Sequence, residues 1–409
     1  MRELKVIDLS RTRITKVPKS VMSLKKLNPL VLDGCSRLSR IPSLVKLTLL
    51  RKLDLRGCKN IKGVPNGLGM LFNLTYLGLR ETGIERIPDG VVCKLKKLQH
   101  LEADDIAVKG EEVGKLRKLE ALRCRFENVN ELNEYTLRAT TIESYSLIIG
   151  ARTNLSYRRG VPGHCADKLK FINSDKFIIM YEGEYKIGET CHLPRDVKAL
   201  WIRDYGGTWN ISSFTGLEEL EELWITGGDE LSALGGSGGQ PEEPERQLEE
   251  RTSPPPPGDH CPNLKTISVD DCEEMKEVIG GQELDHGVTS SLFLSPIPAA
   301  SPDDQLSTRK LNLKLSFLPE LESICSWTGL RDLIHVIEIS RCPKLKRIEM
   351  LDDASPPPSL EEIVLIEEED GNRDKQWWES LEWVHPEAKT TLEPYVFVYL
   401  FPRLREYQS

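Results

Sequence analysis

The sequence predicts an α/β solenoid, a coil of stacked units with a parallel β-sheet along its concave face and short or irregular helices along its convex face. Three observations lead to this prediction. Apolar residues recur in one fixed order every 23 or 24 residues between positions 27 and 88, and a proline ends each copy. No single copy can bury its own apolar row, so the copies must stack.

Each copy reads L-x-x-L-x-L, then cysteine or threonine, then two further aliphatic residues before the proline. In the second copy, Leu53 and Leu55 are two positions apart and therefore point to the same side of a short strand, whereas Asp54 between them points outward. This pattern is that of a leucine-rich repeat. About twelve copies predict a horseshoe-shaped solenoid.

A small residue with a weak polar group follows the strand in each repeat. We expect cysteine here to be a small buried hydrophobe, and threonine to hydrogen-bond the backbone of the turn. The periodic spacing argues against disulfides, and the absence of a C-x-x-C pair argues against zinc, so we expect no metal and no cofactor. The structural positions of this kind are Cys35, Cys58, Thr82, Cys272 and Cys342.

The regularity of the repeat divides the chain. Its irregular part contains strand-like runs at 145–149 and 177–181, whereas a later Gly- and Pro-rich stretch cannot bury enough apolar area to become ordered. The predicted parts are 1–125, regular leucine-rich repeats; 126–196, irregular repeats; 197–234, leucine-rich repeats; 235–260, a disordered loop of glycine, acidic residues and proline; 261–376, leucine-rich repeats with a loop at 280–308; and 377–409, an aromatic C-terminal cap.

The final segment differs from the repeats by its aromatic content. Trp377, Trp378 and Trp383 precede the run 395–401, which is rich in tyrosine and phenylalanine. Terminal repeats of a solenoid are atypical because they must cover its open end, so we interpret the segment as a cap. The alternative is a ligand pocket.

The overall charge and hydropathy limit the classes of partner. The chain has 64 acidic and 55 basic residues, a formal charge of −9, which argues against nucleic acid or an anionic membrane as the main partner. No apolar run reaches the 18 residues or so of a membrane-spanning helix, so we expect no membrane insertion. Charged residues also interrupt the N-terminus where a signal peptide needs its apolar core. We therefore expect a cytoplasmic protein.

Two motifs resemble catalytic signatures without fulfilling them. The stretch 110–116 is one residue short of a phosphate-binding loop, and Leu116 stands where serine or threonine would bind magnesium. The stretch 235–239 matches G-x-S-x-G but lies in a glycine linker without a strand to hold the nucleophile. The histidines show no metal-binding spacing. We therefore do not expect an enzyme.

Binding specificity is expected at the outward residue of each L-x-L strand. Trp201 and Trp224 occupy this position in successive repeats, so they should lie side by side at about 4.8 Å. Two exposed tryptophans are typical of a binding hot spot; the alternative is that the irregular region covers them. The predicted partner-binding residues are Trp201, Trp224, Arg123, Glu102 and Asp54.

Several phrases resemble one protein family. They include L-D-L-x-G-C at 53–58, L-P-x-D-V-K-A-L-W-I at 193–202, C-P-K-L-K-x-I at 342–348 and W-W-E-S-L-E-W at 377–383. This sequence resembles the leucine-rich-repeat region of plant intracellular nucleotide-binding disease resistance proteins of the coiled-coil class. The resemblance implies a module of innate immunity that senses a pathogen effector or a modified host protein and restrains a nucleotide-binding switch.

The chain lacks parts of that family. The coiled coil and the nucleotide-binding module, which would be an N-terminal partner of the repeats, are missing, and the first repeat begins almost at Met1 without a cap. We therefore expect a truncated or partial chain, and carry over neither ATP binding nor oligomeric signalling. The alternative is a freestanding intracellular leucine-rich-repeat scaffold or regulatory protein, which would need its own N-terminal cap.

Overall fold

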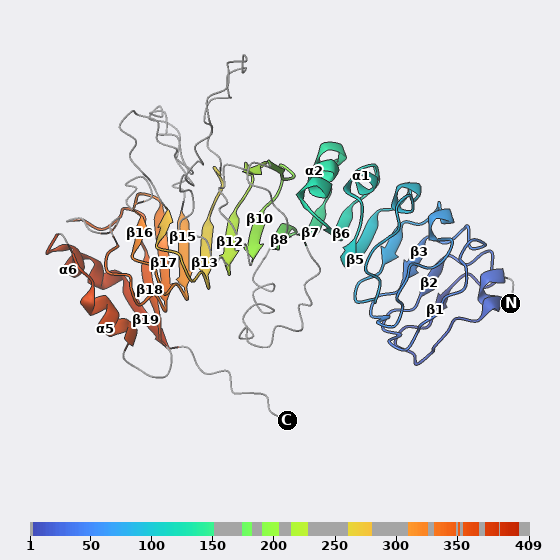
Figure 1. Ribbon diagram of the computed structural model, residues 1–409, viewed down its shortest axis with the longest axis horizontal. Coiled ribbons are helices and arrows are strands. Elements are labelled where there is room, and N and C mark those ends of the chain that lie inside the picture. The colour runs from blue at the N-terminus through green and yellow to red at the C-terminus, as the bar shows by residue number, and fades with distance from the viewer. Residues whose placement is uncertain are drawn as a thin grey trace, which may run out of the picture. The chain divides into compact units, whose positions relative to one another are not determined.

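The computed structural model describes most of the repeats (Figure 1). The chain forms two compact units, one of Met1–Lys186 with Cys191–Lys198 and the other of Ile187–Thr190 with Ala199–Ser409. The described residues are 3–150, 174–181, 190–203, 214–227, 261–279, 310–325, 331–348, 351, 355–367, 373–383 and 385–400.

The first unit contains one parallel sheet whose strands follow one another in chain order. The lateral register aligns equivalent repeat positions, so that Leu30 lies beside Leu53 and Leu53 beside Leu77. The parallel sheet predicted from the repeat is thereby confirmed. The strands are β1 (Ile7–Asp8), β2 (Pro29–Val31), β3 (Lys52–Asp54), β4 (Tyr76–Gly78), β5 (His100–Ala107), β6 (Ala121–Phe126), β7 (Ser144–Ile149) and β8 (Lys176–Met180).

Short helices connect these strands. The longest is α2 (Val129–Arg138), which begins where the Asn128 side chain accepts a hydrogen bond from the Glu131 backbone N–H, a standard N-cap. The others are η1 (Lys19–Ser23), η2 (Leu68–Met70), η3 (Val92–Lys94) and α1 (Gly110–Val113), and the short strand β9 (Cys191–His192) contacts α2.

The core of the first unit consists of stacked leucine rows. Leu53 and Leu55 are completely buried, as are the leucines at the same positions in the neighbouring repeats. Full burial of a leucine side chain contributes roughly 1.5–3 kcal/mol, and each repeat contributes several such side chains only because its neighbours cover them.

The small residue that follows the strand is buried at the predicted positions Cys35, Cys58 and Thr82 and bonds the backbone in two ways. The thiols of Cys35 and Cys58 donate to carbonyls of the preceding repeat, Leu9 at 3.0 Å and Leu32 at 3.1 Å. The Thr82 hydroxyl instead donates to Leu79 in its own repeat at 2.8 Å. Cys272 and Cys342 are also buried. Cys35 and Cys58 therefore link successive repeats, and Thr82 closes its own turn. The thiols of Cys272 and Cys342 donate to carbonyls of their own repeats, Asp270 at 3.6 Å and Ser340 at 3.4 Å.

The residue immediately before this position has a left-handed backbone. Gly34 and Gly57 adopt φ of 70° and 68° there. L-amino acids with a Cβ are disfavoured in this region, so glycine fits these turns best. In other repeats the same position is occupied by Arg11, Glu81, Asp271, Phe317 and Arg341, with φ between 53° and 57°.

The second unit repeats this organisation with its own parallel strands in chain order. A small separate pair, β14 (Glu277–Ile279) and β16 (Ser323–Cys325), is also parallel. The strands of the sheet are β10 (Ala199–Arg203), β12 (Glu222–Thr226), β13 (Thr266–Asp270), β15 (Leu311–Ser316), β17 (Ile334–Ser340), β18 (Glu362–Glu367) and β19 (Val396–Leu400), and β11 (Phe214–Thr215) is a further short strand.

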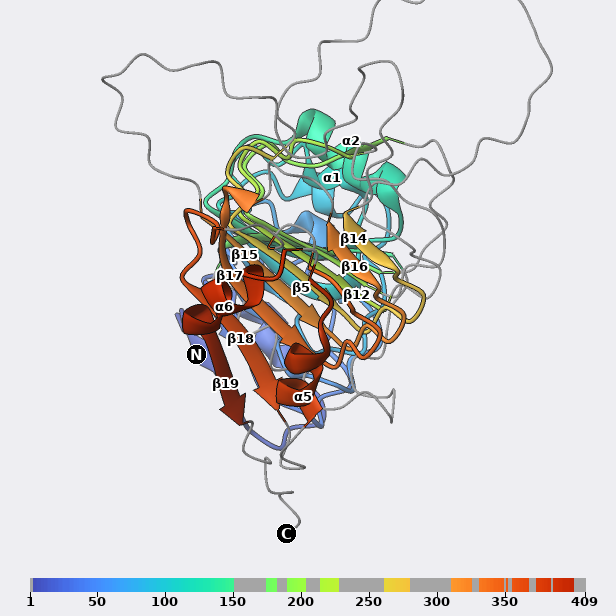
Figure 2. The same cartoon turned by 90° about the vertical axis from the view of Figure 1, so that its left-hand side faces the viewer.

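The aromatic C-terminal segment both packs against the repeats and extends the sheet (Figure 2). Trp378 is buried and contacts Trp383 edge to face at 5.6 Å, while Trp377 Nε1 donates to the Leu345 carbonyl at 2.8 Å. Strand β19 pairs with β18 as the last strand. The helices of this segment are α5 (Arg373–Ser380), α6 (Ala388–Leu392) and η6 (Glu393–Tyr395).

The repeat pattern identified twelve strands, and all of them are present. Within the described residues, apart from the short strands β9, β11, β14 and β16, the sheets contain three further strands, β7, β8 and β19. The first two coincide with the strand-like runs at 145–149 and 177–181, whose aromatic and β-branched residues depart from the leucine pattern. The predicted loops at 235–260 and 280–308 lie outside the described residues. No helix in the described part is long and apolar enough to cross a membrane.

Substituting Gly57 by alanine should destabilise the first unit by about 1–2 kcal/mol, because alanine would adopt a left-handed backbone. Its Cβ would also lie 3.2 Å from the Cα of Gly34. Gly63→Ala is the matched control, since a Cβ there meets nothing within 4 Å and the backbone is not left-handed. Urea unfolding followed by circular dichroism measures both. Equal stability of the two variants would contradict this account of the turn.

The Cys58 thiol should resist alkylation in the folded protein. Burial raises its pKa to about 12, so at pH 8 it is almost entirely protonated as well as inaccessible. Cys93 is only partly buried and provides the internal comparison. A short iodoacetamide pulse followed by peptide mass spectrometry should label Cys93 and spare Cys58, and both should react in guanidinium chloride. Equal labelling in the folded protein would contradict the buried assignment.

Candidate functional site

The outward residues of the first sheet form a continuous row. The register places Asp54 beside Gly78, Gly78 beside Glu102, and Glu102 beside Arg123. The predicted partner-binding residues Asp54, Glu102 and Arg123 therefore lie on one face, contributed by β3, β5 and β6. This face carries no apolar core residue, so its side chains are available for polar chemistry.

Arg56 is the centre of this face. Its guanidinium donates through Nε to Asp54 Oδ1 and through Nη2 to Asp54 Oδ2, both at 2.9 Å. Its third contact is from Nη1 to Glu102 Oε2 at 3.3 Å. A two-pronged arginine–carboxylate pair has a fixed geometry and is stronger than a single hydrogen bond. The hydrogen bonds with Asp54 raise the pKa of the Arg56 guanidinium, which keeps it charged.

Tyr76 completes the arrangement from β4. Its hydroxyl donates to Glu102 Oε1 at 2.9 Å, and Lys52 Nζ lies 4.4 Å from its ring centre. Burial, assisted by the hydrogen bond to Glu102, raises the pKa of the Tyr76 phenol, so it remains a donor. Gly78 makes room for this ring, because a Cβ there would lie 3.1 Å from the tyrosine hydroxyl.

The expectation that the Asp54 side chain is exposed to solvent is wrong. Asp54 points outward, as the alternation of the strand predicts, but its side chain is only 1% exposed. Lys52, Arg56 and Tyr76 surround it. Asp54 therefore fixes the orientation of Arg56 and does not itself present a carboxylate to solvent.

A second group of charges continues the face toward β6. Arg80 Nε lies 3.3 Å from Asp104 Oδ2, and Arg123 Nη1 lies 4.0 Å from Asp104 Oδ1. Arg80 and Arg123 are 49% and 44% exposed, more than the carboxylate between them. Exposed pairs of this kind add little to stability, so their side chains can exchange partners readily. The set Asp54, Arg56, Tyr76, Arg80, Glu102, Asp104 and Arg123 is called the charged face below.

Four members of the charged face were not predicted: Arg56, Tyr76, Arg80 and Asp104. Each stands two residues before or after the single outward position considered in its strand. Side chains on one face of a strand recur with a period of two, so residues two positions before or after the central outward residue lie on the same face. Reading three outward residues in each repeat would have identified them.

The second unit brings the predicted tryptophans together as lateral neighbours, Trp201 in β10 beside Trp224 in β12. Their side chains are not equivalent. Trp201 is only 1% exposed, and its Nε1 donates to Thr226 Oγ1 at 3.0 Å, while the guanidinium of Arg203 lies 5.0 Å from its ring centre. The expectation that Trp201 is exposed is therefore wrong.

Trp224 is half-buried, and its Nε1 donates to Glu222 Oε2 at 3.1 Å. The row continues from Trp224 through Ser268 to Lys314, and Lys314 forms a 3.0 Å ion pair with Glu338. A role of Trp201 or Trp224 in partner binding remains a prediction. Of the two, Trp224 alone presents part of its ring to solvent.

The charged face can supply hydrogen bonds and paired charges. Within the described residues, no three histidine, cysteine, aspartate or glutamate side chains lie close enough together to hold a metal ion. The charged face offers guanidinium groups, carboxylates and one phenol in fixed positions. Such an array matches hydrogen-bonding groups and charges on a macromolecular surface.

Comparisons with known proteins agree with the repeat architecture. Residues 36–134 match the family described as "Leucine-rich repeat region". Disease resistance protein At4g27190 of Arabidopsis thaliana is 26% identical over 434 residues, which cover 96% of this chain and 42% of that protein. Putative disease resistance protein At4g19050 of the same plant is 31% identical over 101 residues, or 25% of this chain and 8% of that protein.

A solved structure also aligns with most of the chain. The leucine-rich-repeat protein LIC12759 of Leptospira interrogans covers 96% of this chain and 95% of its own, at 14% identity and a TM-score of 0.33. The chain spans less than half the length of the first plant relative. The chain is thus similar in sequence to plant disease resistance proteins, and its residues 36–134 match a leucine-rich-repeat region.

Proposed function

We propose that this chain is the protein-recognition module of a plant disease resistance receptor, and that it senses a pathogen effector or a modified host protein through the outward face of its sheets. The observation that carries the proposal is the similarity to a disease resistance protein over 96% of the chain. The charged face supplies a surface on which such recognition can take place.

The charged face favours protein recognition because its side chains are already ordered. Arg56 is held by two hydrogen bonds to Asp54, and Glu102 is held by Arg56 and Tyr76. Binding therefore immobilises few additional rotamers, which lowers the entropy that association must overcome. Arg80 and Arg123 are the most exposed cations of the face and would meet carboxylates of the partner first.

We further propose that the module acts in the cytoplasm and restrains a nucleotide-binding switch until a partner binds. The proposal is supported by the lengths of the two proteins, because the chain covers 42% of At4g27190. A receptor of that length contains further segments, and binding of a partner to this module could control them. The switch would be in equilibrium between a restrained and a released form. A partner that binds the released form more tightly shifts this equilibrium by the ratio of its two affinities. A freestanding scaffold would bind proteins through the same face without this coupling.

Charge reversal on the charged face should weaken recognition. The purified chain would be screened by biolayer interferometry against a panel of secreted effector proteins from plant pathogens. For a binder, Arg80→Glu combined with Arg123→Glu should raise the dissociation constant by about tenfold or more, because a reversed charge opposes the partner's carboxylates.

The control is Arg37→Glu, the same type of change at an exposed position after β2, outside the charged face. It should leave the affinity within about twofold. Binders that lose affinity equally with both variants, or with neither, would contradict recognition by the charged face. A panel without any binder would contradict the direct sensing of effectors.

A further inference from the structure

The distribution of charge along the chain is strongly uneven. Residues 1–100 contain 21 lysine and arginine residues against 7 aspartate and glutamate residues, a formal charge of +14, whereas the whole chain is −9. Binding at a surface depends on local charge, so the net charge of the chain conceals a basic region. This region belongs to the first unit and includes more cations than the charged face uses.

Many of these cations lie in the turns that lead into the strands. The first residues of β2, β3, β4 and β5 lie side by side. The residues three positions before each of these strands are therefore lateral neighbours as well. Two contacts confirm this alignment: Lys26 pairs with Glu3 at 2.5 Å, and Lys97 donates to Asn73 Oδ1 at 2.8 Å. The exposed lysines of these turns are Lys25, Lys26, Lys46, Lys94, Lys96 and Lys97.

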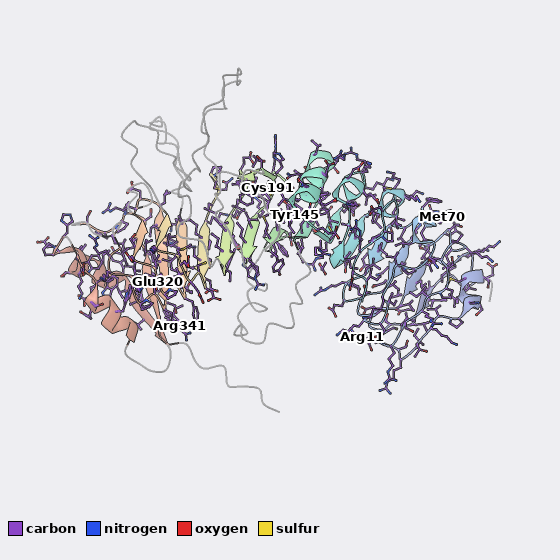
Figure 3. The ribbon with its side chains drawn as sticks, viewed as in Figure 1. Arg11, Met70, Tyr145, Cys191, Glu320 and Arg341 are labelled. Carbon is purple, nitrogen blue, oxygen red and sulfur yellow. The ribbon has the colours of Figure 1, made fainter. Side chains whose placement is uncertain are left out.

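Large apolar side chains are exposed on the same side. Val6 is 56%, Leu49 51%, Phe72 50% and Met70 43% exposed. Met70 lies on the opposite side of the first unit from Arg11, which follows β1 (Figure 3). Exposed apolar residues that gather in one place mark interaction sites, whereas isolated ones need no explanation.

A depression of about 410 Å³ lies among these residues. Lys5 and Arg51 occupy equivalent positions in their repeats, each one residue before the first outward residue at the start of the strand. Lys26 also lines the depression. Val6, Pro29 and Leu49 supply apolar surface in the same hollow, and no carboxylate lines it. The hollow thus combines the cations Lys5 and Arg51 with an apolar wall, and Lys26 pairs with Glu3.

We propose that this hollow and the turns beside it, here named the strand-start edge, dock an acidic amphipathic segment of a partner polypeptide. Carboxylates of the segment pair with Lys5 and Arg51, and its apolar side chains cover Val6 and Leu49. Charge complementarity fixes the sign of the partner, and the exposed apolar residues require that it also carry apolar groups.

The shape of the strand-start edge favours a polypeptide over other anions. A nucleic acid presents phosphates along its backbone and would leave Val6 and Leu49 uncovered. An anionic membrane is flat and engages protruding groups, whereas Lys5, Arg51 and Leu49 surround a depression. The edge is distinct from the charged face, so this docking site goes beyond the proposed recognition function and can fail independently of it.

The test uses the full chain and a fluorescein-labelled dodecapeptide of glutamate and leucine, EELEELLEELEE, in fluorescence anisotropy. Lys5→Glu combined with Arg51→Glu should weaken binding at least tenfold, and Leu49→Ser should weaken it about threefold to tenfold. An all-glutamate dodecapeptide should bind more weakly than the amphipathic one to the unaltered chain. Binding should also fall as salt rises.

The matched control is Arg37→Glu combined with Lys59→Glu, the same change in charge at exposed positions in the turns after β2 and β3. It should retain binding within about twofold. Equal loss in both double variants would overturn the site. Tighter binding of a DNA duplex, or of vesicles with 30% phosphatidylserine, that depends on Lys5, Arg51 and Leu49 would overturn the polypeptide as occupant. Circular dichroism verifies that each variant is folded.

Discussion

The structure depends on the burial of leucine rows between successive repeats. A single repeat has a strand of two to eight residues and one apolar edge, which no local structure covers. Leu53 and Leu55 become fully buried because Leu30 and Leu32 lie on one side and Leu77 and Leu79 on the other. The parallel ladder and the leucine stack therefore form together, and the repeat length fixes the register between neighbours.

The turn after each strand adapts the backbone to this stack. A left-handed residue reverses the chain direction. The buried cysteine or threonine then donates a side-chain hydrogen bond to a carbonyl that also accepts one from a backbone N–H, as at Leu32 and Leu79. Cys58 does so across two repeats, which couples neighbouring turns, whereas Thr82 acts within one. The leucine stack does not require particular residues at the outward positions of the strands or at the exposed positions of the turns. Both proposed binding surfaces, the charged face and the strand-start edge, consist of such residues.

The two surfaces differ in how their charges are balanced. On the charged face, Arg56 and Asp54 neutralise each other and order the side chains around them. On the strand-start edge, Lys5 and Arg51 line a hollow with apolar residues and without carboxylates. A fixed, internally paired array favours geometric recognition of a folded surface, and a basic hollow favours an acidic chain. The formal charge of −9 pointed away from anionic partners only because it averages over the whole chain.

The sequence by itself determined which inward repeat positions are buried and which repeat positions become neighbours, since Leu53, Cys58 and Thr82 follow a period that the leucine stack enforces. It also placed Trp201 beside Trp224, and Gly78 between Asp54 and Glu102. Only the tertiary structure decided what these outward residues do: Trp201 is covered beside Thr226 and Arg203, and Asp54 lies beneath Arg56 and Tyr76. The physical reason is that exposure on a sheet depends on side chains two residues away in the same strand and one whole repeat away in the next, which the repeat pattern leaves unspecified.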